Sequence, residues 1–190
     1  MSFLGAVAYL QHTRVDVLPF ISALQRFNMK PKIEHAKKLN RLLKWLQKNP
    51  KKLNYPPLRE GKTHLRIVSD AAFKKETDTG HSLRGTLLIR AEGANDSDFQ
   101  NSSCKGHLID WACKTQRHVA RSTFAAELLS AGDAVDQGLL MGQLLHDVIQ
   151  GPVSAEQART FRRQGGFAVP LVLYVDAKSV CAAVSATFVK

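Results

Sequence analysis

The chain has 190 residues, of which 44% are hydrophobic and 23% charged, and its formal net charge is +11. This composition is that of a folded protein and excludes wholesale disorder, and no apolar run approaches the ~20 residues that span a bilayer. The start of the chain has no basic segment ahead of a long apolar one, and the three cysteines form no Cys-x-x-Cys pair. We therefore expect a protein of a reducing compartment, cytoplasmic or nuclear, that is neither secreted nor membrane-bound.

Most of the positive charge lies in the first third of the chain. Residues 1–60 hold 12 Lys and Arg against three acids, a net charge of +9, whereas residues 61–190 hold 15 basic and 13 acidic residues. A concentrated basic segment favours a polyanionic partner, most often nucleic acid. A solvated helix face without a partner is the competing interpretation at this point.

A helical pattern runs from residue 6 to residue 46 and is interrupted at Pro31. The second helix of this segment is expected to end before Asn49-Pro50, because the residue before a proline avoids the helical conformation. Trp45, at helical spacing, is expected in the core. The apolar positions of this helix are Ile33, Ala36, Leu39, Leu42, Leu43 and Leu46. Largely off that stripe lie the basic residues Lys37, Lys38, Arg41, Lys44 and Lys48.

A proline-containing loop at residues 55–57 marks the expected boundary between a basic helical segment, 1–60, and a domain over 61–190. Within that domain, strands are predicted over 63–70, 83–90, 107–113 and 171–176. A long helix is predicted over 122–150, with Ser122 or Thr123 as its N-cap, followed by a loop over 151–166 and a last helix over 179–187. This order predicts an α/β fold whose mixed sheet combines an antiparallel meander with one parallel strand, with helices packed on it.

Three carboxylates stand at positions that could be brought together. Asp70 and Asp176 end predicted strands, and Glu127 lies in the first turns of the long helix. If they converged, they would repel one another unless a cation neutralised them, and oxygen ligands favour Mg²⁺ or Mn²⁺. From spacing alone, an ordinary role is favoured for each acid, because Asp is common at strand ends and Glu suits a helix N-terminus.

Several motifs in this domain occur in a characteristic order. They are Val68-Ser69-Asp70-Ala71, Ser82-Leu83-Arg84-Gly85, Trp111-Ala112-Cys113-Lys114-Thr115-Gln116, Ser122-Thr123-Phe124-Ala125-Ala126-Glu127 and Tyr174-Val175-Asp176-Ala177-Lys178-Ser179. Together they resemble the RNase H domain of copia-type retrotransposon polyproteins over roughly 120 residues. The basic segment, with Thr13-Arg14-Val15-Asp16 and Arg41-Leu42-Leu43-Lys44-Trp45-Leu46, resembles the thumb or connection region of the same polyproteins.

The resemblance implies an RNase H-like fold and metal-dependent cleavage of the RNA strand of an RNA–DNA hybrid. It implies that Asp70, Glu127 and Asp176 are catalytic metal ligands for two Mg²⁺ or Mn²⁺ ions. It also implies that the Ser69 and Ser179 hydroxyls and the Lys178 amine face the substrate. The residues expected to bind nucleic acid are Lys37, Lys38, Arg41, Lys44, Lys48 and Lys178. The expected partners are an RNA–DNA hybrid or other duplex, and the remainder of the polyprotein.

Two departures from the family pattern keep alternatives open. No Asp or Glu follows Asp176, so the family's fourth acid is expected to be absent and the domain truncated. Tyr174-Val175-Asp176-Ala177 is not the polymerase motif, because its second acid is replaced by Ala177, and no polymerase site is expected. The alternatives are a nucleic-acid-binding remnant without catalysis and a decayed retroelement fragment without function.

Overall fold

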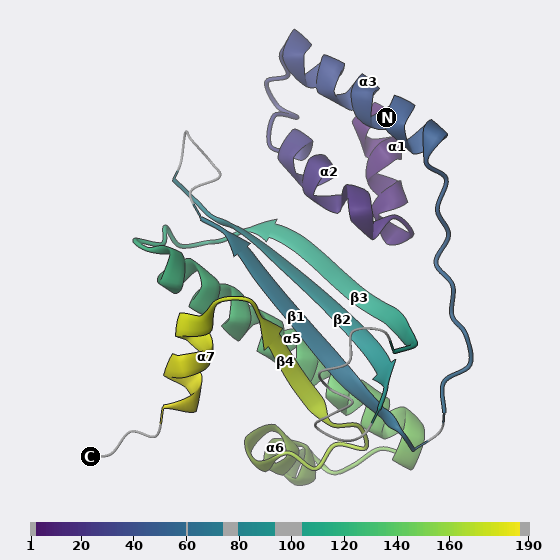
Figure 1. Cartoon of the computed structure of the whole chain (residues 1–190), viewed down its shortest axis with the longest axis vertical. Coiled ribbons are helices and arrows are strands. Elements are labelled where there is room, and N and C mark those ends of the chain that lie inside the picture. The colour runs from purple at the N-terminus through teal and green to yellow at the C-terminus, as the bar shows by residue number, and fades with distance from the viewer. Residues whose placement is uncertain (1–2, 60, 74–79, 94–103, 187–190) are drawn as a thin grey trace. The chain divides into compact units, whose positions relative to one another are not determined.

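A computed structural model describes residues 3–59, 61–73, 80–93 and 104–186 (Figure 1). The chain divides into two compact units, Met1–Asn54 and Tyr55–Lys190, which we call the helical unit and the sheet unit. Tyr55 lies with the sheet unit, since its hydroxyl donates a hydrogen bond to the Leu108 carbonyl at 3.0 Å and its ring contacts the ring of His107. None of the described helices has both the length and the apolar character that a membrane span requires.

The helical unit is built from three α-helices and two short 3₁₀ turns. In chain order these are α1 (Phe3–Tyr9), η1 (Leu10–His12), η2 (Val15–Val17), α2 (Leu18–Gln25) and α3 (Ile33–Lys48). Pro31 separates α2 from α3, as the sequence predicts. Their shared core is formed by Val7, Val17, Ile21, Leu24 and Leu42.

The apolar stripe predicted for α3 is wrong in its first turn, and the separate expectation that Trp45 lies in the core is also wrong. Ile33 and Ala36 are exposed, and His35 takes the inward position because its ring stacks on Phe27 at 4.0 Å. The Trp45 side chain is 41% exposed and lies beside the core instead of in it. Its ring is covered on one face by the Arg14 guanidinium, 5.5 Å from the ring centroid, a cation–π contact that replaces core packing.

The sheet unit contains one four-stranded sheet in the order β3-β2-β1-β4. The strands are β1 (Thr63–Ala72), β2 (Leu83–Glu92), β3 (Gly106–Thr115) and β4 (Leu171–Val175). β1, β2 and β3 pair antiparallel, and β4 pairs parallel to β1 at one edge (Figure 1). The predicted fold class is confirmed: the protein is α/β with a mixed sheet, consistent with an RNase H-like fold.

Helix α5 (Thr123–Gln150) lies across one face of this sheet (Figure 1). Its inward positions are mostly small residues, which let its backbone approach β1 closely. A Cβ added to Gly138 would come within 2.1 Å of the Ile67 side chain, which is itself buried. The core between helix and sheet is formed by Leu65, Ile67, Leu88, Ala134 and Val169.

The predicted loop over 151–166 is wrong, because it contains helix α6 (Ala155–Gln164). The helix begins at a capping box in which Ser154 Oγ accepts from the Gln157 backbone and the Gln157 side chain accepts from the Ser154 backbone. Its one aromatic side chain, Phe161, contacts His146 of α5 and Phe167. The last helix is α7 (Lys178–Ser185), directly after β4.

Candidate metal centre

Asp70 and Asp176 are neighbours because two parallel strands place them there. β1 and β4 are in register with Ser69 opposite Val175, so the next residue along each strand is an aspartate. β1 continues past Asp70 to Ala72, whereas β4 ends at Val175, directly before Asp176. Asp70 therefore lies within its strand and not at its end, and both side chains are exposed.

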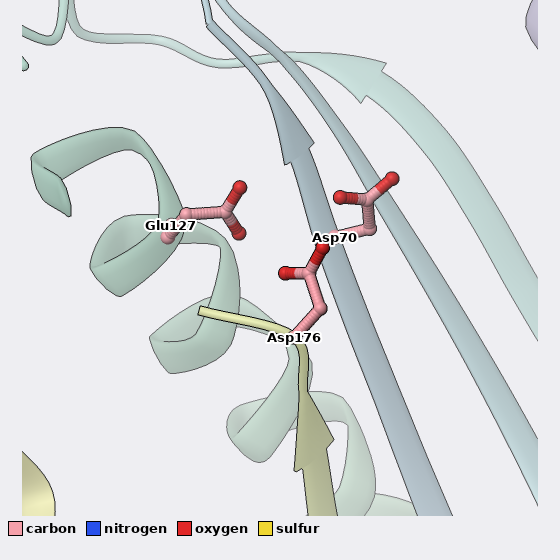
Figure 2. A group of neighbouring side chains, drawn as sticks. All are labelled: Asp70, Glu127 and Asp176. Atoms are coloured by element: carbon pink, nitrogen blue, oxygen red, sulfur yellow. The ribbon is translucent and has the colours of Figure 1, made fainter. Parts of the chain in front are cut away.

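Glu127 reaches the same point from helix α5. Ser122 is the N-cap, as predicted, since its Oγ accepts a hydrogen bond from the Ala125 N–H at 3.1 Å. One turn after Glu127, the Ser130 hydroxyl donates to the Asp70 carbonyl oxygen at 2.9 Å. The helix is thus fastened to β1 beside Asp70, and Figure 2 shows the Glu127 carboxylate pointing toward the two aspartates.

The three carboxylates form a compact acidic cluster. One carboxylate oxygen from each of Asp70, Glu127 and Asp176 lies within 4.8 Å of the other two, and no other such group of His, Cys, Asp or Glu occurs among the described residues. Burial, and then the charges of Asp70 and Asp176, raise the pKa of Glu127 above its ordinary value. Bringing three like charges together is unfavourable unless a cation compensates them.

The donor set fits a hard divalent cation. The Glu127 side chain is 5% exposed, and its Oε2 has no hydrogen-bond partner in the described part of the chain, although the Ala71 backbone N–H does bond this carboxylate. A buried carboxylate oxygen without a donor is costly unless something else binds it. Three oxygen ligands without Cys or His suit Mg²⁺ or Mn²⁺ and not zinc.

The remaining residues predicted near the substrate do not all face solvent. Lys178 and Ser179 are exposed at the start of α7. The expectation for the Ser69 hydroxyl is wrong, because Ser69 is buried under α5 and its Oγ bonds the Ser130 Oγ at 3.0 Å. Sequence reasoning missed Ser130. A single serine in the middle of a helix gives no signal that its hydroxyl fastens α5 to the strand carrying Asp70.

The predicted basic residues of α3 are exposed, and four of them align. Lys37, Lys38, Arg41, Lys44 and Lys48 are all exposed. At 3.6 residues per turn, four fall on one line, on the side of the helix away from its core contacts. We call this line the basic stripe: Lys37, Arg41, Lys44 and Lys48. Lys38 lies about a quarter-turn away, on the side of α3 that carries Trp45.

Comparison with known proteins finds relatives among retrotransposon proteins. The chain is 28% identical over 130 residues to the Retrovirus-related Pol polyprotein from transposon RE1 of Arabidopsis thaliana, and equally identical over the same length to that from transposon RE2. It is 26% identical over 140 residues to Secreted RxLR effector protein 161 of Plasmopara viticola. No protein-family model matches the chain.

The extent of these matches differs greatly between the relatives. Each polyprotein match covers 68% of this chain but only 8% of the polyprotein, whereas the effector match covers 73% of this chain and 88% of the effector. The chain therefore spans a small part of the polyproteins' length. The resemblance to copia-type retrotransposon polyproteins is confirmed by the two polyprotein matches.

Proposed function

We propose that this chain, related to copia-type retrotransposon polyproteins, carries a ribonuclease H site that cleaves the RNA strand of RNA–DNA hybrids with a divalent metal. The observation that carries the proposal is the convergence of Asp70, Glu127 and Asp176 from three separate elements onto one point. Their positions match the acids of the RNase H motif that the sequence resembles. The buried Glu127 Oε2, which has no hydrogen-bond partner among the residues that the structure describes, supports a metal-binding role over a chance grouping of surface acids.

The residues that would hold the metal are these three carboxylates. When bound, divalent ions supply activation of a water molecule and stabilisation of the departing oxygen of a phosphodiester. The protein contributes a fixed arrangement of ligands. The register of β1 and β4 sets the two aspartates side by side, and Ser130 fixes α5 so that Glu127 remains directed at Asp70.

A nucleic-acid substrate is favoured by the charge of the helical unit. The basic stripe places four cationic side chains over about 16 Å of helix, and such side chains bind phosphates without reading sequence. Lys178, exposed two residues after Asp176 in the sequence, adds a cation to the sheet unit. Each unit thus carries exposed cations that favour a polyanionic substrate.

The test is cleavage of a hybrid with labelled RNA by the full chain in Mg²⁺. We expect cleavage of RNA in the hybrid but not in an RNA–RNA duplex, and a loss of at least about 100-fold in Asp70→Asn. The matched control is Asp136→Asn, which removes an exposed acid of α5 outside the cluster and should leave the rate unchanged. Equal rates in wild type and Asp70→Asn would overturn the proposal.

A second candidate function, nucleic-acid binding without cleavage, is favoured by one separate observation. The basic stripe belongs to the helical unit and the carboxylates to the sheet unit, so binding does not depend on an intact metal site. This candidate predicts that wild type binds the hybrid with an affinity that falls steeply with salt but leaves the RNA intact in Mg²⁺ and Mn²⁺. Affinity that is unchanged between low and moderate salt would contradict it.

A further inference from the structure

The helical unit contains a groove that the proposed function does not use. It lies along α2 and α3, has a volume of about 720 Å³, and opens to solvent. Leu24, His35 and Leu42 are its buried members. Its exposed lining includes Phe20, Phe27, Lys38, Arg41, Trp45 and Lys51. A volume of this size is that of a ligand-binding pocket, not of a packing defect.

Three aromatic side chains line the groove while remaining open to water. Phe20 is 59% exposed and Trp45 41%, and Phe27 is exposed on the side away from His35. Each could bury further apolar area if a partner occupied the groove, at about 25 cal/mol per Å² removed from water. A contiguous exposed apolar surface of this kind commonly marks an interaction site.

The rim of the groove is positively charged. Lys38, Arg41 and Lys51 supply three cations around it. The one acid in the lining, Asp16, is already compensated: its two oxygens accept hydrogen bonds from Arg14 at 2.9 Å each, and Lys51 lies 3.7 Å away. Because Lys51 shares Asp16, an occupant meets an apolar surface beside Lys38 and Arg41, whose charges the one acid of the described lining does not compensate.

We propose that this groove docks an acidic amphipathic helix of a partner protein. The α3 wall from His35 to Trp45 is about 15 Å long, which matches some ten residues of a bound helix. Such a helix would insert apolar side chains at i, i+3 or i+4, and i+7, and its Asp and Glu residues would face Lys38, Arg41 and Lys51. Charge complementarity with the rim selects an acidic partner over a basic one.

A helix suits the groove better than nucleic acid does. The side-chain acceptors of the lining, which the amino groups of a base would need, are engaged: His35 Nδ1 accepts from the Lys32 N–H at 3.0 Å, and Asp16 accepts from Arg14. The residues suited to phosphates form the basic stripe on another side of α3. Of that stripe, only Arg41 also lines the groove.

The test is selection of a displayed library of 16-residue helical peptides against the full chain, followed by affinity measurement with the labelled consensus peptide. We expect a consensus that combines aromatic or Leu residues at helical spacing with Asp or Glu at flanking positions. Phe20→Asp should weaken binding at least 10-fold, whereas Phe3→Asp, which alters an exposed phenylalanine of α1 outside the groove, should leave it unchanged. Selection of no peptide, or of a consensus without acids, would overturn the proposal.

The adjacent lysines Lys37 and Lys38 provide a sharper control. Both are exposed, but only Lys38 lines the groove. Lys38→Glu should weaken the consensus peptide at least 5-fold and should strengthen a version whose acids are replaced by lysines. Lys37→Glu, on the basic stripe, should do neither. Equal effects at the two positions would mean non-specific attraction and would overturn the proposal. A second result would also overturn the proposal: a 20-nucleotide single-stranded DNA that displaces the peptide and binds Phe20→Asp more weakly than wild type. Nucleic acid would then be the ligand of the groove.

Discussion

The two units of this protein assemble their charged groups in different ways. In the helical unit, the basic stripe comes from one helix, and the 3.6-residue repeat alone aligns its four cations. In the sheet unit, Asp70, Glu127 and Asp176 come from two strands and a helix far apart in sequence. The stripe is therefore a local feature that can lose one member and keep the rest. The acidic cluster is a tertiary feature whose members act on one point and depend on each other.

The largest expected effect tests whether the cluster acts as a unit, and it rests on the proposed function. Asp70→Asn, Glu127→Gln and Asp176→Asn should each lower single-turnover cleavage of a hybrid on the order of 1,000-fold. The double variant Asp70→Asn with Asp176→Asn should fall no further than either single one, because one missing ligand already disables the site. Losses that multiply in the double variant would show that the carboxylates act independently.

A pair of glycines in α5 tests how closely this helix must approach β1. Gly138→Ala should destabilise the sheet unit by about 1–3 kcal/mol, because the added methyl group meets the buried Ile67 side chain. Gly132→Ala meets nothing within 4 Å and should stabilise it by about 0.5–1 kcal/mol. The measurement is denaturant unfolding followed by Trp111 fluorescence in a Trp45→Phe background, since each unit holds one of the chain's two tryptophans. Equal effects of the two substitutions would contradict the close contact.

This contrast between local and tertiary features also explains how much the sequence predicts. Four strands, the long helix and its Ser122 cap follow from hydrophobic period and residue type, because these signals are local. The hydrophobic period alone could not identify Asp70, Glu127 and Asp176 as site residues among the 13 acids after residue 60. Their motifs resemble a known family, and that resemblance selected them. Their convergence follows from the register of β1 and β4, which is a property of the sheet.

The predictions that fail do so where tertiary contacts override the local pattern. Helix α6 exposes most of its length and holds one large apolar side chain, Phe161, so it lacks the run of large apolar residues on which the helix prediction depends. Trp45 has the spacing of a core residue, but Arg14 covers its ring and leaves it at the edge of a groove. The role of Ser130 becomes visible only when α5 is placed against β1.

The protonation of Glu127 gives the sheet unit a pH dependence opposite in sign to that of the helical unit, where the Arg14 hydrogen bond lowers the pKa of Asp16. Because burial and two neighbouring acids raise its pKa above the ordinary 4.5, the folded state binds this proton more tightly than the unfolded chain. The stabilisation of the folded state by this proton is complete at a pH below the ordinary pKa. It is lost as the pH rises through the raised pKa of the folded state. In EDTA, the melting temperature followed by Trp111 should therefore fall over that window in wild type more than in Glu127→Gln. Parallel pH profiles of the two proteins would contradict this.

The smallest expected effects are those of single residues in the basic stripe. Lys37→Ala, Lys44→Ala and Lys48→Ala should each weaken hybrid binding about 3-fold and lower the dependence of log affinity on log salt by about one unit. The triple variant should lose about 30-fold, since independent sites add in free energy. Lys30→Ala, an exposed lysine of the same unit off α3, is the matched control and should change little. If one substitution removed most of the affinity, just as one carboxylate substitution is expected to remove most of the cleavage, the stripe would be a single specific site and the distinction between the two units would fail. Additive losses would instead mean that the helical unit holds nucleic acid through a row of equivalent contacts, each replaceable without loss of the others.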